Sequence, residues 1–224
     1  MITADYLSSI APWAQDLTAA ERERAARGSV EKHFAKGDYI CHEGGRMNYW
    51  CGVASGIVKV GTISTHGKAV TFAGVPPSGW VGEGSVLKDE IRQYDIVALR
   101  DSRVVLMQKT TFHWLFENSV GFNRFLVRLL NERLGQFIAT VISDRMFDAR
   151  ARVARSLGWL FNPILYPGVG RFLDISQEEL ALLCGLSRQA VNKALKELEE
   201  EDLLTLDRNG IRVVDLAGLS RYGA

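Results

Sequence analysis

The sequence of 224 residues lacks the features that mark membrane, secreted or disulfide-rich proteins. No stretch of about eighteen residues is free of charged side chains, so we expect no transmembrane helix. The first residues lack the basic and apolar regions of a secretory signal. Three cysteines without a Cys-x-x-Cys pair argue against a disulfide framework or a zinc site. We therefore expect a cytoplasmic protein without a membrane partner.

An excess of charge of one sign is also missing. The chain has 27 lysine and arginine residues against 26 aspartate and glutamate residues, a formal net charge of +1. Bulk charge therefore gives no support to nucleic-acid binding. Any role of that kind has to come from the local placement of residues.

The residue patterns of the common metal centres are absent as well. A jelly-roll metalloenzyme needs a His-x-His motif, whereas the two nearest histidines, His33 and His42, lie nine positions apart. An iron–sulfur sensor needs clustered cysteine ligands, and the cysteines at positions 41, 51 and 184 are widely spaced. We therefore predict no metal site and no enzyme.

What the sequence does contain first is a glycine-punctuated β region. Between residues 30 and 108, short runs of β-branched and aromatic residues are interrupted at regular intervals by Gly37, Gly45, Gly56, Gly67 and Gly79. Regular turns of this kind predict an antiparallel β-roll or jelly roll. We place the tip of one hairpin at His66-Gly67.

A long helical pattern follows the β region. From residue 120 to about 145, apolar residues recur every three or four positions, which predicts a helix about 40 Å long. Such a stripe is longer than one small roll covers, so we predict a subunit interface, although a core helix lying across the roll stays open. The predicted interface residues are Leu126, Leu130, Leu134, Phe137 and Val141.

The last third of the chain predicts a winged helix-turn-helix. Ser176 and Glu179 have the spacing of a capping box, and Ser187 caps a second helix after a turn at Gly185. Two short helices joined by a glycine turn are typical of a helix-turn-helix. Asn209-Gly210 between two apolar runs predicts the hairpin of a wing. The chain is thus expected to be α+β: an antiparallel β-roll, a long dimerisation helix and a winged helix.

The second helix of this motif carries side chains suited to reading DNA. Arginine pairs with guanine, and glutamine or asparagine pairs with adenine in the major groove. Hydroxyls at helix N-termini suit phosphate contacts. The predicted DNA-binding residues are Ser176, Ser187, Arg188, Gln189, Asn192 and Lys193. A solvated helix face is the alternative interpretation, and the turn and wing argue against it.

The order of these parts resembles the Crp/Fnr family of bacterial transcription regulators, over residues 11–219. The motifs that carry the resemblance are Phe34-Ala-Lys-Gly37-Asp38, Ala54-Ser-Gly56-Ile-Val58, Gly79-Trp-Val-Gly82-Glu83 and Leu186-Ser-Arg-Gln-Ala-Val191. The resemblance implies a homodimer that binds a palindromic site on double-stranded DNA, with RNA polymerase as a protein partner. It also implies a roll, residues 1–118, that senses an effector, a dimerisation helix, residues 119–146, and a DNA-binding domain, residues 147–224.

In the cyclic-nucleotide branch of that family, a Gly-Glu pair and a later arginine cradle the cyclic phosphate and ribose. Gly82-Glu83 and Arg92 match this cradle, whereas Gln93 and Tyr94 replace small residues and Phe137 and Ile138 replace the polar residues that read adenine. The predicted effector residues are Gly82, Glu83, Gly84, Arg92, Gln93 and Phe137.

Several interpretations of this pocket stay open. The effector is an unidentified small anion or nucleotide, cyclic AMP itself, or none, if bulky Gln93 and Tyr94 fill the pocket. Glu83 and Arg92 alternatively form only a structural ion pair. A cyclic-nucleotide-binding module without a DNA role is the competing class of function, and the winged helix argues against it.

Overall fold

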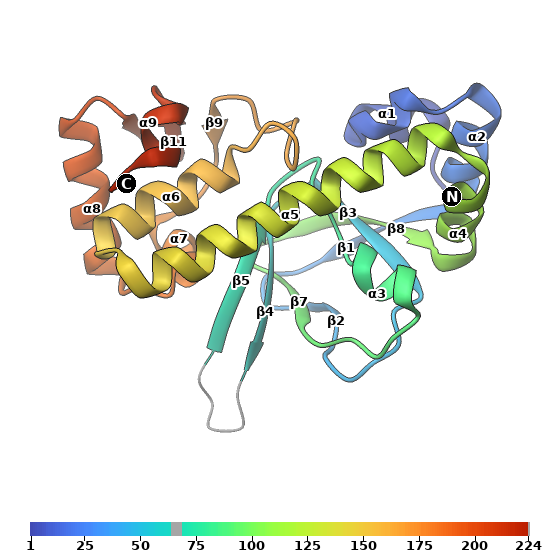
Figure 1. Ribbon diagram of the computed structural model, residues 1–224, viewed down its shortest axis with the longest axis horizontal. Helices are drawn as coiled ribbons and strands as arrows, with labels where there is room; N and C mark the ends of the chain where they lie inside the picture. The colour runs from blue at the N-terminus through green and yellow to red at the C-terminus, as the bar shows by residue number, and fades with distance from the viewer. Residues whose placement is uncertain (64–68, 224) are drawn as a thin grey trace.

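The computed structural model describes residues 1–63 and 69–223. Figure 1 shows one long helix, α5 (Val120–Met146), running across the molecule. The β-roll and the N-terminal helices lie along one part of α5, and the winged helix lies at its C-terminal end. Within the described ranges, no helix is long and apolar enough to cross a membrane.

The roll consists of two four-stranded antiparallel sheets, which confirms the predicted architecture. The first sheet has the order β1 (Ser29–Phe34), β8 (Ser102–Gln108), β3 (Tyr49–Ser55) and β6 (Trp80–Val81). The second has the order β2 (Tyr39–Cys41), β7 (Asp95–Ala98), β4 (Val58–Ile63) and β5 (Ala69–Val75). The predicted hairpin tip at His66-Gly67 lies outside the described residues.

Five short helices pack against the roll around an aromatic core. They are α1 (Ala4–Ile10), the 3-10 helix η1 (Pro12–Asp16), α2 (Ala19–Arg27), α3 (Glu83–Lys88) and α4 (Lys109–Asn118). The rings of Trp13, Trp50 and Trp80 lie within 5.2 Å of one another, centroid to centroid. Such tilted and edge-on aromatic pairs stabilise a core beyond the burial of their area.

Helix α5 is buried on one face and exposed on another. Ser119 caps its first turn, and Phe122, Leu126 and Leu129 pack into the core of the roll. Between its two ends, α5 has seven apolar side chains that are 40% or more exposed: Val127, Leu130, Leu134, Phe137, Ile138, Val141 and Ile142. We call this set the apolar face of α5. Leu126 does not belong to it, because its side chain is only 2% exposed.

The elements of the winged helix include the predicted helix-turn-helix and hairpin. They are α6 (Ala149–Leu160), β9 (Phe172–Leu173), α7 (Gln177–Cys184), α8 (Arg188–Glu200), β10 (Leu204–Asp207), β11 (Gly210–Val213) and α9 (Leu216–Arg221). Ser176 and Glu179 form the capping box of α7, and Gly185 ends α7 with a φ of 62°. A left-handed residue after a helix favours glycine, so the turn between α7 and α8 depends on it.

The roll and the winged helix exchange apolar side chains. Ile57 and Leu99 belong to the roll in sequence but pack in the core of the winged helix. Leu165 and Tyr166 follow α6 but pack in the core of the roll. All four are 4% exposed or less. The two parts are therefore packed against each other through buried contacts.

Candidate nucleic-acid interface and effector pocket

The first candidate site is the start of α8. Its apolar side chains Val191, Leu195 and Leu198 are fully buried, whereas Ser187, Arg188, Gln189 and Lys193 are exposed. The Ser187 hydroxyl accepts a hydrogen bond from the backbone N–H of Ala190 at 3.2 Å, which fixes the beginning of the helix. An arginine and a glutamine in the first turn of an exposed helix have the reach and the chemistry to contact base edges.

Besides Ser187, three of the six predicted DNA-binding residues have polar partners within the motif. Asn192 is half-buried, and its side-chain oxygen accepts a long hydrogen bond of 3.4 Å from the amide of Gln177. The Ser176 hydroxyl is engaged in the capping box with Glu179. Lys193 lies 3.8 Å from Glu197, one turn further along α8. Ser176 thus lies at the start of α7, and the other five residues lie at the start or in the first two turns of α8. Their contacts with DNA stay predictions.

The second candidate site surrounds Arg92, a fully buried arginine of the roll. Its Nε donates to the carbonyl of Tyr94 at 2.9 Å, and its guanidinium lies over the Tyr94 ring, 4.5 Å from the centroid. Its Nη1 contacts the sulfur of Met47. Gly82 has a φ of 99°, and a side chain at this position would collide with Met47. The backbone at Gly82 therefore favours glycine because of its left-handed conformation, and any side chain there would also displace the end of Met47.

Glu83 pairs with an arginine of α5 rather than with Arg92. Its carboxylate lies 3.7 Å from the Nε of Arg133, and both side chains are buried. Burial opposes the charge of Arg133, but the nearby Tyr166 and Glu83 outweigh it, so the pKa of Arg133 is raised. Arg133 also donates to Gln136 and Tyr166 and to the carbonyl of Trp80, each at 2.9 Å.

Three buried polar atoms at this site lack a hydrogen-bond partner among the described residues. They are Nη2 of Arg92, Oε2 of Glu83 and Nε of Arg133. Buried polar groups are nearly always hydrogen-bonded, so unpaired ones call for an explanation. The guanidinium groups of Arg92 and Arg133 and the carboxylate of Glu83 are all close enough to act on the charge of Tyr94, so the net charge around Tyr94 is positive. We call Glu83, Arg92 and Arg133 the Arg–Glu cluster.

The other predicted effector residues do not join this cluster. Gln93 is exposed and its amide donates to the carbonyl of Ile91 at 3.1 Å, so it does not fill the pocket. Tyr94 and Met47 pack against Arg92 instead. Gly84 has open space at the place of a side chain. Phe137 is 40% exposed and lies on the apolar face of α5.

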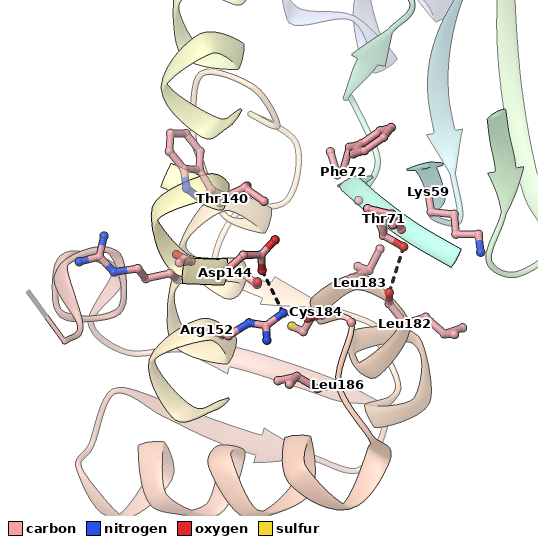
Figure 2. A pocket seen from close by; sticks show the side chains of 18 of the residues that line it. Lys59, Thr71, Phe72, Thr140, Asp144, Arg152, Leu182, Leu183, Cys184 and Leu186 are labelled. Atoms are coloured by element: carbon pink, nitrogen blue, oxygen red, sulfur yellow. Dashed lines mark hydrogen bonds and ion pairs between the residues drawn. The ribbon is translucent and has the colours of Figure 1, made fainter. Parts of the chain in front are cut away.

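A separate cavity of about 620 Å³ lies between the roll and the winged helix. Figure 2 shows Phe72 and Thr71 of β5 on one side and Arg152 of α6 on the other. The Thr71 hydroxyl donates to the carbonyl of Leu182 at 3.1 Å, and Arg152 pairs with Asp144 at 2.9 Å. Among the charged residues that line this cavity, Asp144 and Arg152 thus pair with each other.

Sequence reasoning missed Arg133, Tyr166 and Met47. Arg133 carried a signal: it is a charged residue at helical spacing from the buried Leu129 and Gln136 on α5. Tyr166 and Met47 lie in irregular segments without periodicity, so no local pattern marks them. Their positions depend on tertiary packing alone.

Comparison with known proteins relates both sites to established domains. Residues 31–119 match the family model of the cyclic nucleotide-binding domain. Residues 151–222 match that of the Crp-like helix-turn-helix domain. A β-roll of this kind joined to a winged helix by a long helix defines a class of DNA-binding transcription regulators. The chain belongs to the Crp/Fnr family of that class.

Individual relatives span nearly the whole chain. It is 28% identical over 208 residues to the cyclic AMP receptor protein of Thermus thermophilus, covering 93% of this chain and 91% of the relative. It is 27% identical to a CRP-like cAMP-activated global transcriptional regulator of Mycobacterium tuberculosis, covering 84% and 85%. The crystal structure of the Thermus thermophilus catabolite activator protein aligns with a TM-score of 0.52 at 26% identity, covering 94% and 98%.

A further solved structure supports the fold alone. FixK2 from Bradyrhizobium japonicum aligns with a TM-score of 0.68 at 19% identity, covering 85% of this chain and 95% of that one.

The two family models and the relatives together define the class of function. The protein is a transcription regulator with a cyclic nucleotide-binding domain and a helix-turn-helix DNA-binding domain.

Proposed function

We propose that the protein works as a homodimer that reads a palindromic site on double-stranded DNA in response to a small anion bound in the roll. The exposed side chains at the start of α8 carry the DNA-binding part of this proposal. The apolar face of α5 supports the homodimer, because two copies that pair along it remove its side chains from water. The predicted surface keeps Leu130, Leu134, Phe137 and Val141 and loses Leu126, which the roll already buries.

In this proposal Arg188 and Gln189 contact bases. Asn192 either contacts a base as well or stays bonded to Gln177 and holds α8 against α7. Ser176, Ser187 and Lys193 contact phosphates, which fix the register of the protein on the duplex. Two copies of α8 related by a twofold axis read two half-sites about one helical turn apart. RNA polymerase is the protein partner that we propose for a DNA-bound regulator of this family.

Replacing Arg188 tests the DNA-binding role. Arg188→Ala should weaken binding to a specific duplex by about 1–3 kcal/mol, because a bidentate arginine–guanine contact is lost. The duplex is one selected from a random pool by the unaltered protein, and binding is measured by fluorescence anisotropy. An equal loss on random DNA would mean that Arg188 contacts only phosphate. Arg208→Ala at the exposed tip of the wing provides a comparison with the same change of charge.

The Arg–Glu cluster supports an anionic effector. The free Nη2 of Arg92 and Nε of Arg133 are donors, and the free Oε2 of Glu83 is an acceptor. A ligand that satisfies all three has an anionic oxygen next to a hydroxyl group. Cyclic AMP has this combination, and two relatives carry cyclic AMP in their names. We propose it as the first ligand to test, although Phe137 and Ile138 offer no polar group to an adenine ring.

Calorimetry with cyclic AMP tests this part of the proposal. We expect binding at one site per chain and its loss in Arg92→Gln, since the guanidinium that meets the anion is removed. Arg103→Gln is the matched control, because Arg103 is 52% exposed on β8 and pairs with Glu31 within the roll. If cyclic AMP gave neither binding heat nor a shift in the melting temperature, it would not be the effector, and other hydroxylated anions would be tested in the same way. DNA binding that is equally tight without any of them would favour a vestigial pocket.

A further inference from the structure

Arg100, a residue of the roll, reaches the first helix of the helix-turn-helix. It follows β7, beside the buried Leu99. Its Nε donates to one oxygen of Glu179 at 2.7 Å, and its Nη2 donates to the other. Its Nη1 lies 3.0 Å from the carboxylate of Asp174. One guanidinium of the sensor domain thus holds two carboxylates of the DNA-binding domain.

The contact with Glu179 is a strong one. Arginine and carboxylate form two parallel charge-assisted hydrogen bonds, the geometry in which this pair is most specific. The Glu179 side chain is only 8% exposed. Hydrogen bonds to Glu179 raise the pKa of Arg100. Burial opposes the charge of Glu179, but bonds from Arg100 and Ser176 outweigh it, so the pKa of Glu179 is lowered.

Glu179 connects Arg100 to a residue predicted to contact DNA. The oxygen that accepts from Arg100 Nη2 also accepts from the backbone N–H and the hydroxyl of Ser176, each at 2.8 Å. Ser176 is the N-cap of α7, and its neighbours Gln177 and Glu178 begin that helix. The position of Arg100 therefore fixes the N-terminus of α7 against the roll.

This contact leaves the DNA-reading side of α8 uncovered. Ser187, Arg188, Gln189 and Lys193 are exposed while Arg100 holds Glu179. A cleft of about 600 Å³ is bordered by Arg100, Ser176, Arg188 and the wing residue Arg208. Arg100 thus lies at the margin of the DNA-reading surface without blocking it. It also offsets the negative charge of Asp174 and Glu179, which would otherwise repel phosphates.

We infer that Arg100 is a positioning residue for DNA binding: it acts through Glu179 and Ser176 to hold the winged helix in the orientation in which a dimer meets DNA. In that role Arg100 sets the separation of the two α8 helices, and so the half-site spacing that the dimer accepts. The inference rests on the DNA-binding function and on the proposed dimer. It does not depend on the identity or the existence of an effector.

Arg100→Gln in the full-length protein tests this role. The probes are a palindromic duplex selected from a random pool by the unaltered protein and derivatives with one or two base pairs added to or removed from its centre. We expect affinity for the selected duplex to fall about tenfold, the size of effect typical of a lost hydrogen bond between charged groups. We also expect the preference for the selected spacing to flatten, while affinity for unrelated DNA stays unchanged.

Arg103→Gln is the control, since it removes the same charge three residues away at a side chain that pairs with Glu31 inside the roll. Arg100→Lys keeps the charge but loses the bidentate contact with Glu179. Its affinity for the selected duplex should therefore lie between those of Arg100→Gln and Arg103→Gln. Lysine also serves as the test variant if the glutamine variant does not fold, as judged by circular dichroism. The double variant Arg100→Gln, Glu179→Gln should bind no more weakly than Arg100→Gln alone, because the two residues act as one unit.

Three results would overturn the inference. Tighter DNA binding in Arg100→Gln would make the contact inhibitory. Unchanged affinity and spacing preference would make it irrelevant to DNA binding. A salt dependence reduced by about one counterion would mean that Arg100 itself contacts a phosphate. Arg188→Ala separates these outcomes from failure of the DNA-binding assignment, since it should weaken binding at every spacing.

Discussion

At the scale of single residues, two glycines of the roll have opposite requirements. Gly56 has a φ of 87°, and a side chain there would collide with the hydroxyl of Ser102 and the carbonyl of Asp101. Gly84 lies in α3 with open space at the same position. The first position needs glycine because of conformation and close approach, whereas the second does not.

We expect Gly56→Ala to lower the free energy of unfolding by about 2 kcal/mol or more, since strain and collision add. Gly84→Ala is the matched change, and it should raise stability by as much as about 1 kcal/mol because alanine favours a helix. Urea unfolding followed by circular dichroism measures both. Equal effects of the two substitutions would contradict the steric argument.

Glu179 predicts how stability depends on pH. Its pKa in the folded protein is lowered, so its contribution is present above the ordinary glutamate value of about 4.3 and is lost as the pH falls through the folded value. Glu179→Gln should therefore lose less stability than the unaltered protein between pH 6 and pH 3.5, measured by urea unfolding. Glu178→Gln is the control, because Glu178 is 63% exposed and lies 3.9 Å from Lys36. It should keep the unaltered pH dependence.

At the scale of the elements, the loop between α6 and β9 connects the winged helix to the Arg–Glu cluster. The Tyr166 hydroxyl donates to the carbonyl of Gly74 in β5 and accepts from Nη1 of Arg133, both at 2.9 Å. Arg133 in turn pairs with Glu83. A buried path of side chains therefore leads from the Arg–Glu cluster to the segment that precedes the DNA-binding motif.

Tyr166→Phe removes this hydroxyl and leaves a carbonyl and a guanidinium N–H without their partner. We expect the free energy of unfolding to fall by about 1–3 kcal/mol, the usual result of leaving a buried polar group unpaired. Tyr222→Phe is the control, because the Tyr222 hydroxyl bonds to Glu201 at an exposed site. Denaturant unfolding compares the two variants. Equal losses in the free energy of unfolding would mean that the buried hydroxyl contributes no more than the exposed one.

Local sequence signals predicted most of the elements. The capping box at Ser176 and Glu179 and the turn at Asn209-Gly210 are written in adjacent residues, and the structure has both. Helix α3 escaped prediction because its sequence, Glu83–Lys88, is one short turn-rich segment inside a β pattern. The pairing of Arg100 with Glu179 joins residues 79 positions apart, so only the packing of the two domains creates it.

At the scale of the whole molecule, the apolar face of α5 is the surface that a second copy would cover. Its side chains are 40–67% exposed in the single chain. Replacing both Leu134 and Phe137 by aspartate should give monomers by light scattering, because unpaired carboxylates would be buried between the helices. Ile164→Asp is the control, because Ile164 is 48% exposed and lies in the loop between α6 and β9. This variant should keep the mass of the unaltered protein. A dimer that survives the double change would place the interface elsewhere.

Of the five predicted interface residues, Leu126 is buried in the single chain and the other four are exposed. Leu126 shares the helical spacing of Leu130 and Leu134, but the rotation of α5 turns it into the core of the roll. Periodicity identifies an apolar stripe, whereas the partner of each residue on it depends on what lies beside the helix. The Arg–Glu cluster shows the same limit, since Arg92 and Glu83 follow the family pattern, whereas their neighbours Met47 and Arg133 cannot be derived from it.

Ile57 and Leu99 of the roll pack in the core of the winged helix, and Leu165 and Tyr166 pack in the core of the roll. This exchange restricts where the chain can be divided into separate domains. Cutting the chain at the end of α5 would leave a hole in each fragment and expose the side chains that had filled the other. Joining this winged helix to the roll of a relative would meet the same obstacle unless all four positions were carried over. A substitution at any of these four positions therefore alters the packing of both parts, which share one hydrophobic interior.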